Sequence, residues 1–128
     1  MNREQILDIV RRLRTDDKII INNWKEPFTV CGKSEHYVLA WDGGDEYTII
    51  KRDPIDFGPY NGITKGAIVC AADSWVFGYK DGYHFDDPAW VRRYLHDLET
   101  GETEMSMRHR EEINEITLWP ANGREGDT

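Results

Sequence analysis

The segment FTVCGKSEHYVLAWDGGDEYTIIKR, from Phe28 to Arg52, decides the fold of this chain. It contains three short apolar runs, separated first by Gly32–Ser34 and then by Asp42–Asp45. Glycine, serine and aspartate favour tight turns, and short apolar runs between such turns are typical of antiparallel hairpins. The segment therefore predicts a three-stranded antiparallel meander, with strands at 28–31, 37–41 and 47–50.

Amphipathic helices are expected on both sides of this meander. Apolar residues at helical spacing predict a helix over 3–14, and Asn2 begins a capping-box pattern in front of it. The second helix has clearer limits. Asp87 suits its N-cap, Pro88 suits its first helical position, and Gly101 is placed to end it.

The remaining segments predict further strands and one long loop. Strands are expected at 18–22, 67–71, 74–79, 102–108 and 113–119. The segments 67–71 and 74–79 could equally be one bulged strand. The segments 102–108 and 113–119 would pair as a terminal hairpin, with a short helix at 108–116 as the alternative. The segment 53–66 contains two prolines and three glycines, which favour a loop.

Together these elements predict an α+β fold. A curved antiparallel sheet would pack against one main helix, with an N-terminal amphipathic helix covering another edge or face. We expect one globular domain over residues 1–120 and a frayed tail at 121–128. The expected core residues are Ile6, Val10, Val30, Val38, Leu39, Ile49, Ile50, Ile68, Val69, Phe77, Trp90, Tyr94, Leu98 and Met105.

The chain is acidic, with 24 Asp and Glu residues against 16 Lys and Arg residues and a formal net charge of −8. Nucleic acid phosphates and anionic membrane surfaces both attract basic segments, so this balance argues against either as a direct partner. It is compatible with a partner protein that has a basic surface. An acidic surface also keeps a small domain soluble without any partner.

The sequence indicates a cytoplasmic, reduced protein. Met1 leads directly into an amphipathic segment, and no apolar run approaches the roughly 20 residues of a membrane span. Cys31 and Cys70 lie within apolar runs, where small buried thiols are common. We expect no cofactor, and either a monomer or a dimer.

The sequence gives only weak signs of catalysis. The sequence contains no nucleophile elbow, P-loop or metalloprotease motif. Cys31 and His36 could form a nucleophile pair, but a thiol in the middle of a strand favours a structural role. We therefore expect a binding protein rather than an enzyme.

Carboxylates at two predicted turns, with one aromatic ring, form the expected partner-binding surface. The contact residues would be Asp42, Asp45 and Glu46 at the tip of the second hairpin, then Asp53, Asp56 and Tyr60 in the loop. Spaced carboxylates can imitate the phosphates of nucleic acid, and tyrosine is common at the centre of protein interfaces. This surface would suit a protein with a basic face.

A divalent metal site is the alternative kind of site. The motif KDGYHFDD brings Asp81, His84 and Asp86 close together in sequence, just before the N-cap of the second helix. Carboxylate oxygens and an imidazole nitrogen are suitable ligands for such an ion. A polar turn that leads into a capped helix explains the same residues without a metal.

The order of motifs resembles that of small uncharacterised proteins encoded in phage and prophage genomes. The motifs are PFTV, YVLA, EYTII and VFGY, then a helix that ends in YLHDLETGE, then EMSMRHR. The resemblance covers Trp24 to Arg110. It implies a small α+β domain in a phage or mobile-element setting, located in the host cytoplasm, and it implies no catalytic residue.

Three functions follow as hypotheses. The first is a non-enzymatic protein that binds a host protein and inhibits an enzyme that handles nucleic acid. The second is a domain that binds a small molecule or a divalent metal, centred on Asp81–Asp87 and Gly58–Gly62. The third is an immunity protein that neutralises a basic toxin.

Overall fold

The computed structural model describes residues 1–56, 62–74, 82–105 and 110–119, without the side chains of 72–74. Its helices are α1 (Arg3–Arg12) and α2 (Pro88–Thr100). Its strands are β1 (Lys18–Ile21), β2 (Phe28–Lys33), β3 (Tyr37–Trp41), β4 (Glu46–Lys51), β5 (Val69–Ser74), β6 (Arg110–Glu112) and β7 (Ile116–Leu118).

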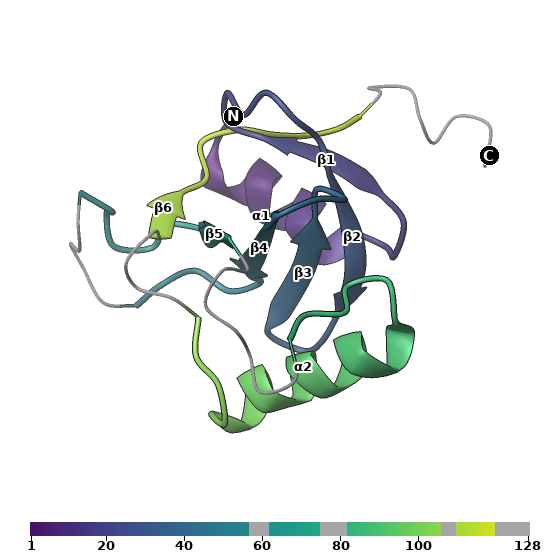
Figure 1. Cartoon of the computed structure of the whole chain (residues 1–128). Helices are drawn as coiled ribbons and strands as arrows, with labels where there is room; N and C mark the ends of the chain where they lie inside the picture. Colours follow the sequence, from purple (N-terminus) through teal and green to yellow (C-terminus); the bar gives the residue numbers. More distant parts are fainter. Residues whose placement is uncertain (57–61, 75–81, 106–109, 120–128) are drawn as a thin grey trace.

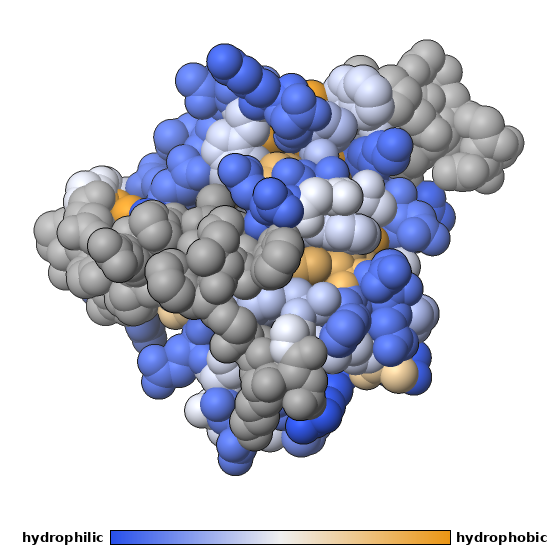
Figure 2. Space-filling view, viewed as in Figure 1, coloured by the Kyte–Doolittle hydropathy of each residue, from blue (hydrophilic) through white to orange (hydrophobic). Residues whose placement is uncertain are grey.

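The strands form one antiparallel sheet in the order β6-β5-β4-β3-β2-β1-β7. The sheet curls into a half-barrel, and α1 and α2 lie on its opposite sides (Figure 1). The predicted α+β class, with one main helix and an N-terminal helix, is confirmed. On the face seen in Figure 1, most of the surface is hydrophilic (Figure 2).

Side chains that alternate along the strands build two cores, one on each face of the sheet. On β3, Leu39 joins the cluster packed against α2, whereas Val38 and Ala40 join the cluster packed against α1. We call these the α2-side core and the α1-side core. This alternation follows from the pleat of a strand, which directs successive side chains to opposite faces. The sheet is therefore the middle layer of the molecule.

The helix ends follow local chemistry. Asn2 and Gln5 form the predicted capping box at the start of α1. The Asp87 carboxylate accepts a hydrogen bond from the backbone N–H of Ala89, and Gly101 ends α2 with a φ of 84°. That φ lies in the left-handed region, which glycine adopts at little cost. α1 ends at Arg12, two residues earlier than predicted, because Leu13 has a ψ of 140°, which is not helical.

The meander is confirmed, but its first turn is displaced. β2 continues to Lys33, so Gly32 lies inside a strand instead of in the predicted turn. The register between β2 and β3 shifts between Val30 and Gly32, which indicates a β-bulge. A Cβ atom at position 32 would lie 2.8 Å from Cγ1 of Val91, so the glycine allows α2 to pack closely on the sheet.

The later strands differ most from the predictions. Residues 69–74 form one strand, as in the alternative of a single strand, and no turn separates 67–71 from residue 74; residues 75–79 lie outside the described residues. Residues 102–105 are not a strand. β6 and β7 do not pair as a terminal hairpin: β6 pairs with β5, and β7 pairs with β1, at opposite ends of the sheet.

The loop between β4 and β5 contributes to the core. Ile55 and Ile63 are both buried in the α2-side core. The backbone N–H of Ile55 donates to the carbonyl of Ala67, and the N–H of Gly66 donates to the carbonyl of Ile55. The described parts of this loop are thus packed on the sheet, and 57–61 lie outside the described residues. Within the described ranges, neither helix is long and apolar enough to cross a membrane.

Candidate binding pocket

The turn between β3 and β4 has a defined shape. The Asp42 carboxylate accepts hydrogen bonds from the backbone N–H groups of Gly44, at 2.7 Å, and Glu46, at 3.2 Å. Gly43 has a φ of 89°, which a side chain would disfavour. Trp41 donates from Nε1 to the carbonyl of Gly44, at 2.8 Å. Asp42 is therefore a structural residue of the turn, and the Trp41 ring has a fixed orientation.

A second segment, residues 82–86, faces this turn on its way into α2. Phe85 is buried, with its ring centroid 5.7 Å from that of Trp41 and 5.2 Å from that of Tyr47. Tyr83 stacks on Phe85, with centroids 5.3 Å apart and planes 16° apart. Aromatic pairs at these distances contribute more than their buried area alone. The rings therefore join the hairpin tip to the segment before α2.

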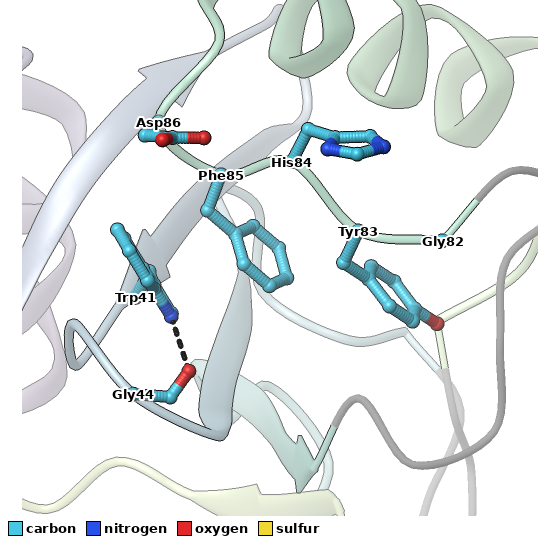
Figure 3. A pocket seen from close by; sticks show the side chains of 7 residues that line it. All are labelled: Trp41, Gly44, Gly82, Tyr83, His84, Phe85 and Asp86. Carbon is cyan, nitrogen blue, oxygen red and sulfur yellow. Dashed lines mark hydrogen bonds between the residues drawn. The ribbon is translucent and has the colours of Figure 1, made fainter.

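Between these segments lies a pocket of about 380 Å³, which we call the tip pocket (Figure 3). It is lined by Trp41, Gly44, Gly82, Tyr83, His84, Phe85 and Asp86. Its volume lies within the range that holds small ligands or single side chains. Aromatic faces form one part of the wall, and the exposed side chains of His84 and Asp86 form the polar part.

The surroundings of the tip pocket favour a cation. Asp45 and Glu46 are exposed on the turn directly after Gly44, and the exposed Asp86 lines the pocket. Aromatic faces attract cations through their negative π-faces, and nearby carboxylates add Coulomb attraction. The phenol of Tyr47, beneath Phe85, stays neutral because burial, then Tyr94 and Tyr83, raises its pKa.

The predicted partner-binding carboxylates lie at the two ends of β4. Asp42, Asp45 and Glu46 lie at the start of β4, whereas Asp53 and Asp56 follow its other end. A strand of this length separates the two groups by roughly 16–20 Å, since each residue rises about 3.3 Å. Tyr60 lies outside the described residues. Only the hairpin-tip group is therefore adjacent to the tip pocket.

The predicted metal ligands fall partly within the tip pocket. His84 and Asp86 both line it, and Asp81 lies outside the described residues. Across the ranges that the structure describes, no group of three or more His, Cys, Asp or Glu side chains could hold a metal ion. The sequence reasoning missed Trp41 and Phe85. The sequence signal that could have identified these two rings is their position, beside a Gly-Gly turn and just before a capped helix.

A second polar cluster joins the turn after β2 to the end of α2. Glu99 accepts hydrogen bonds from the hydroxyl of Ser34, at 2.5 Å, and from the backbone N–H of His36, at 2.7 Å. Its other carboxylate oxygen lies 2.7 Å from Nδ1 of His36. We call this set of contacts the Glu99 clasp. Ser34 and His36 both bind the same carboxylate, so the hydroxyl does not donate to the imidazole as a catalytic pair would require.

The clasp is an ion pair when His36 is protonated. The hydrogen bond to Glu99 raises the pKa of His36 above its ordinary value of 6.5, and the carboxylates of Glu35 and Asp53 add to that effect. Burial alone would raise the pKa of Glu99, but the hydrogen bonds from His36 and Ser34 outweigh it, so the pKa is lowered. Asp53 also lies 3.6 Å from Arg11 of α1. This site therefore holds the β2–β3 turn against the last turn of α2.

Cys31 and His36 do not behave as a nucleophile pair. The Cys31 thiol donates to the carbonyl of Thr29, at 3.6 Å, whereas the His36 imidazole is bound to Glu99. Burial, followed by the nearby charge of Asp16, raises the pKa of Cys31 to about 12. Because the thiolate is the nucleophilic form, this thiol is poorly reactive at neutral pH.

Comparison with protein-family models, curated proteins and solved structures found no match for this chain. Function is therefore inferred from the chemistry of the tip pocket and of the surface around it.

Proposed function

We propose that this chain is a small acidic binding protein, without catalytic activity, whose tip pocket accepts a cationic side chain of a partner protein. The observation that carries the proposal is a pocket with an aromatic wall and a carboxylate, Asp86, surrounded by further carboxylates on the adjacent hairpin tip. The rest of the acidic surface would draw a basic partner toward it.

Arginine fits this pocket better than lysine. Its guanidinium is planar, so it can stack on an aromatic face such as that of Trp41 while it donates hydrogen bonds to a carboxylate such as Asp86. The carbonyl of Gly44, which accepts a hydrogen bond from Trp41, is a polar group in the same pocket wall as the Trp41 ring. A lysine ammonium is a compact, strongly hydrated charge and makes less use of a flat ring.

The partner would be a protein with a basic surface. In the phage setting that the sequence resembles, this is a host protein, and enzymes that handle nucleic acid have such surfaces because they bind phosphates. Occupying that surface would inhibit the enzyme. An immunity protein against a basic toxin would use the same chemistry, and a toxin gene next to this one would favour that version.

Charge reversal at the tip pocket tests the proposal. The variant Asp45→Lys/Glu46→Lys/Asp86→Lys keeps Asp42, which the turn needs. Affinity capture from bacterial host lysate, at low and high salt, should recover a stoichiometric basic protein with the wild type at low salt. The variant should lose it, because each rim charge steers association.

The control variant is Glu4→Lys/Glu102→Lys/Glu104→Lys, which changes the net charge equally at exposed positions away from the pocket. It should retain the partner at low salt. If both variants lose the partner equally, net charge alone explains capture and the pocket has no special part. If the tip variant binds as well as the wild type, the proposal is wrong.

A small molecule is the second candidate ligand, and the volume of the tip pocket favours it. Ligand that binds only the folded state raises the melting temperature in proportion to the logarithm of its concentration. A panel of cationic and aromatic small molecules should then contain a compound whose shift disappears in Trp41→Ala. The absence of any such compound would leave the protein-partner proposal standing alone.

A further inference from the structure

β7 is an edge strand with a free outer side in the described part of the chain. It pairs only with β1, where Ile20 lies opposite Thr117. The N–H of Trp119 donates to Lys18, and the carbonyl of Glu115 accepts from Asn22. Residues that bond inward alternate along an antiparallel strand, so 115, 117 and 119 face β1. The backbone groups of Ile116 and Leu118 therefore point outward.

A largely apolar groove of about 340 Å³ runs beside this edge, between β7 and α1. It is lined by Met1, Asp8, Ile9, Arg12, Leu13, Ile116, Thr117 and Leu118. Among the described residues, the large apolar side chains that are exposed are Met1, at 53%, and Trp119, at 45%. Both lie at this edge of the molecule. Exposed apolar side chains beside unpaired strand backbone are typical of a surface that pairs with another chain.

We propose that this edge binds a second copy of the chain, with the two β7 strands antiparallel about a two-fold axis at Thr117. Ile116 of one copy then lies opposite Leu118 of the other, and their outward N–H and C=O groups pair. Thr117 lies opposite Thr117, a favourable pair across neighbouring strands. Trp119 lies opposite Glu115 of the second copy, so its exposed ring becomes covered.

The charges of the groove are self-complementary, which favours a second copy over other occupants. Asp8 and Arg12 are exposed one turn apart on α1 and bind each other at 3.1 Å. A two-fold axis places the two α1 helices antiparallel, so Asp8 of each copy lies toward Arg12 of the other. Residues 120–128, PANGREGDT, contain no large apolar residue that could fill the groove.

The opposite edge of the sheet differs. There the carbonyl of Glu112 in β6 accepts from the side-chain amide of Asn22, at 3.1 Å, and the Glu112 carboxylate accepts from Thr64. The bond from Asn22 occupies a backbone carbonyl of β6 that an added strand would need. The β7 edge is therefore the better place for pairing.

Disulfide trapping tests the two-fold axis directly. Opposed residues in a non-hydrogen-bonded pair have Cα atoms about 4.5 Å apart, within the range of about 4.4–6.8 Å that a disulfide needs. Thr117→Cys in the untagged chain should form a covalent dimer under mild oxidation. Glu115→Cys, equally exposed on the same strand, would lie opposite Trp119 and should not. Equal trapping of both variants, or of neither, would overturn the proposal.

Sedimentation velocity over a range of concentrations gives an independent test. Leu118→Pro removes an outward N–H and leaves the inward bonds to β1 intact. It should weaken dimer formation about tenfold or more relative to Leu118→Val, which has a similar side-chain size and keeps the N–H. A wild type that stays monomeric at every concentration, or a proline variant that associates as well as the valine variant, would contradict the proposal.

Discussion

At the scale of single residues, a few side chains have roles that depend on their backbone position. Asp42 organises the β3–β4 turn through two backbone N–H groups, which makes it a structural residue although the sequence suggested a contact residue. Asn22 has a left-handed φ of 52°, and its amide bonds to both Glu112 and the segment before β7. Such residues have short polar side chains that tolerate left-handed or turn conformations.

Gly32 provides a prediction at this scale. In Gly32→Ala, the new methyl would lie 2.8 Å from Val91 and 3.3 Å from Leu95 of α2. Overpacking costs about 1–3 kcal/mol, which exceeds the roughly 0.5–1 kcal/mol gained by replacing glycine inside a strand. Urea unfolding should therefore show a lower free energy of unfolding for this variant than for the wild type.

Gly44→Ala is the matched control for Gly32→Ala. Its Cβ would meet only the Asp42 side chain, at 3.5 Å or more. We expect its free energy of unfolding to stay within about 0.5 kcal/mol of the wild type. A Gly32→Ala variant as stable as Gly44→Ala would show that α2 does not pack closely on β2.

At the scale of elements, the Glu99 clasp links the β2–β3 turn to the last turn of α2. His36 has a raised pKa, so its contribution to stability is complete below its ordinary value of 6.5 and disappears as pH rises through the raised pKa. Glu99 has a lowered pKa, so its contribution is complete above 4.5 and disappears as pH falls through the lowered pKa. The clasp therefore stabilises most between these two ordinary values.

The prediction concerns His36→Gln. The difference in melting temperature between wild type and variant should be largest between about pH 4.5 and 6.5, and should narrow on both sides of this window. His96→Gln, at an exposed histidine on α2, is the control for replacing an imidazole. A constant difference from acidic to alkaline pH would mean that the ion pair does not contribute.

The sequence predicted elements that depend on local chemistry. The capping box at Asn2, the cap at Asp87 and the meander are all defined by residues a few positions apart. The Glu99 clasp and the tip pocket are not local. Ser34 and Glu99 are 65 positions apart, and Trp41 meets Phe85 only after the hairpin has packed against the segment before α2. No pattern of neighbouring residues encodes such contacts.

The wrong predictions have a related cause. A terminal hairpin was expected because two alternating segments follow each other closely, yet β6 and β7 pair with different strands at the two ends of the sheet. Which strand a short edge strand pairs with depends on how the whole sheet curves. The spacing of residues in the sequence does not show that curvature.

At the scale of the whole molecule, the curled sheet and its two helices place the tip pocket and the β7 edge in different parts of the fold. The sheet separates two cores, and the tip pocket lies at one end of β4, where the α2-side core reaches the surface. The proposed dimer uses the α1 side and the β7 edge. Both proposals can therefore hold at once, since they involve different residues of the chain.

Whether the tip pocket binds a cationic side chain can be measured by an NMR titration that follows the Trp41 indole N–H. The ligands are an arginine-containing tripeptide and the same peptide with citrulline, a neutral analogue of arginine. We predict saturable shifts of this signal with the arginine peptide, weaker shifts with citrulline, and loss of the response in Asp86→Asn. Equal responses to both peptides, or none to either, would contradict the account.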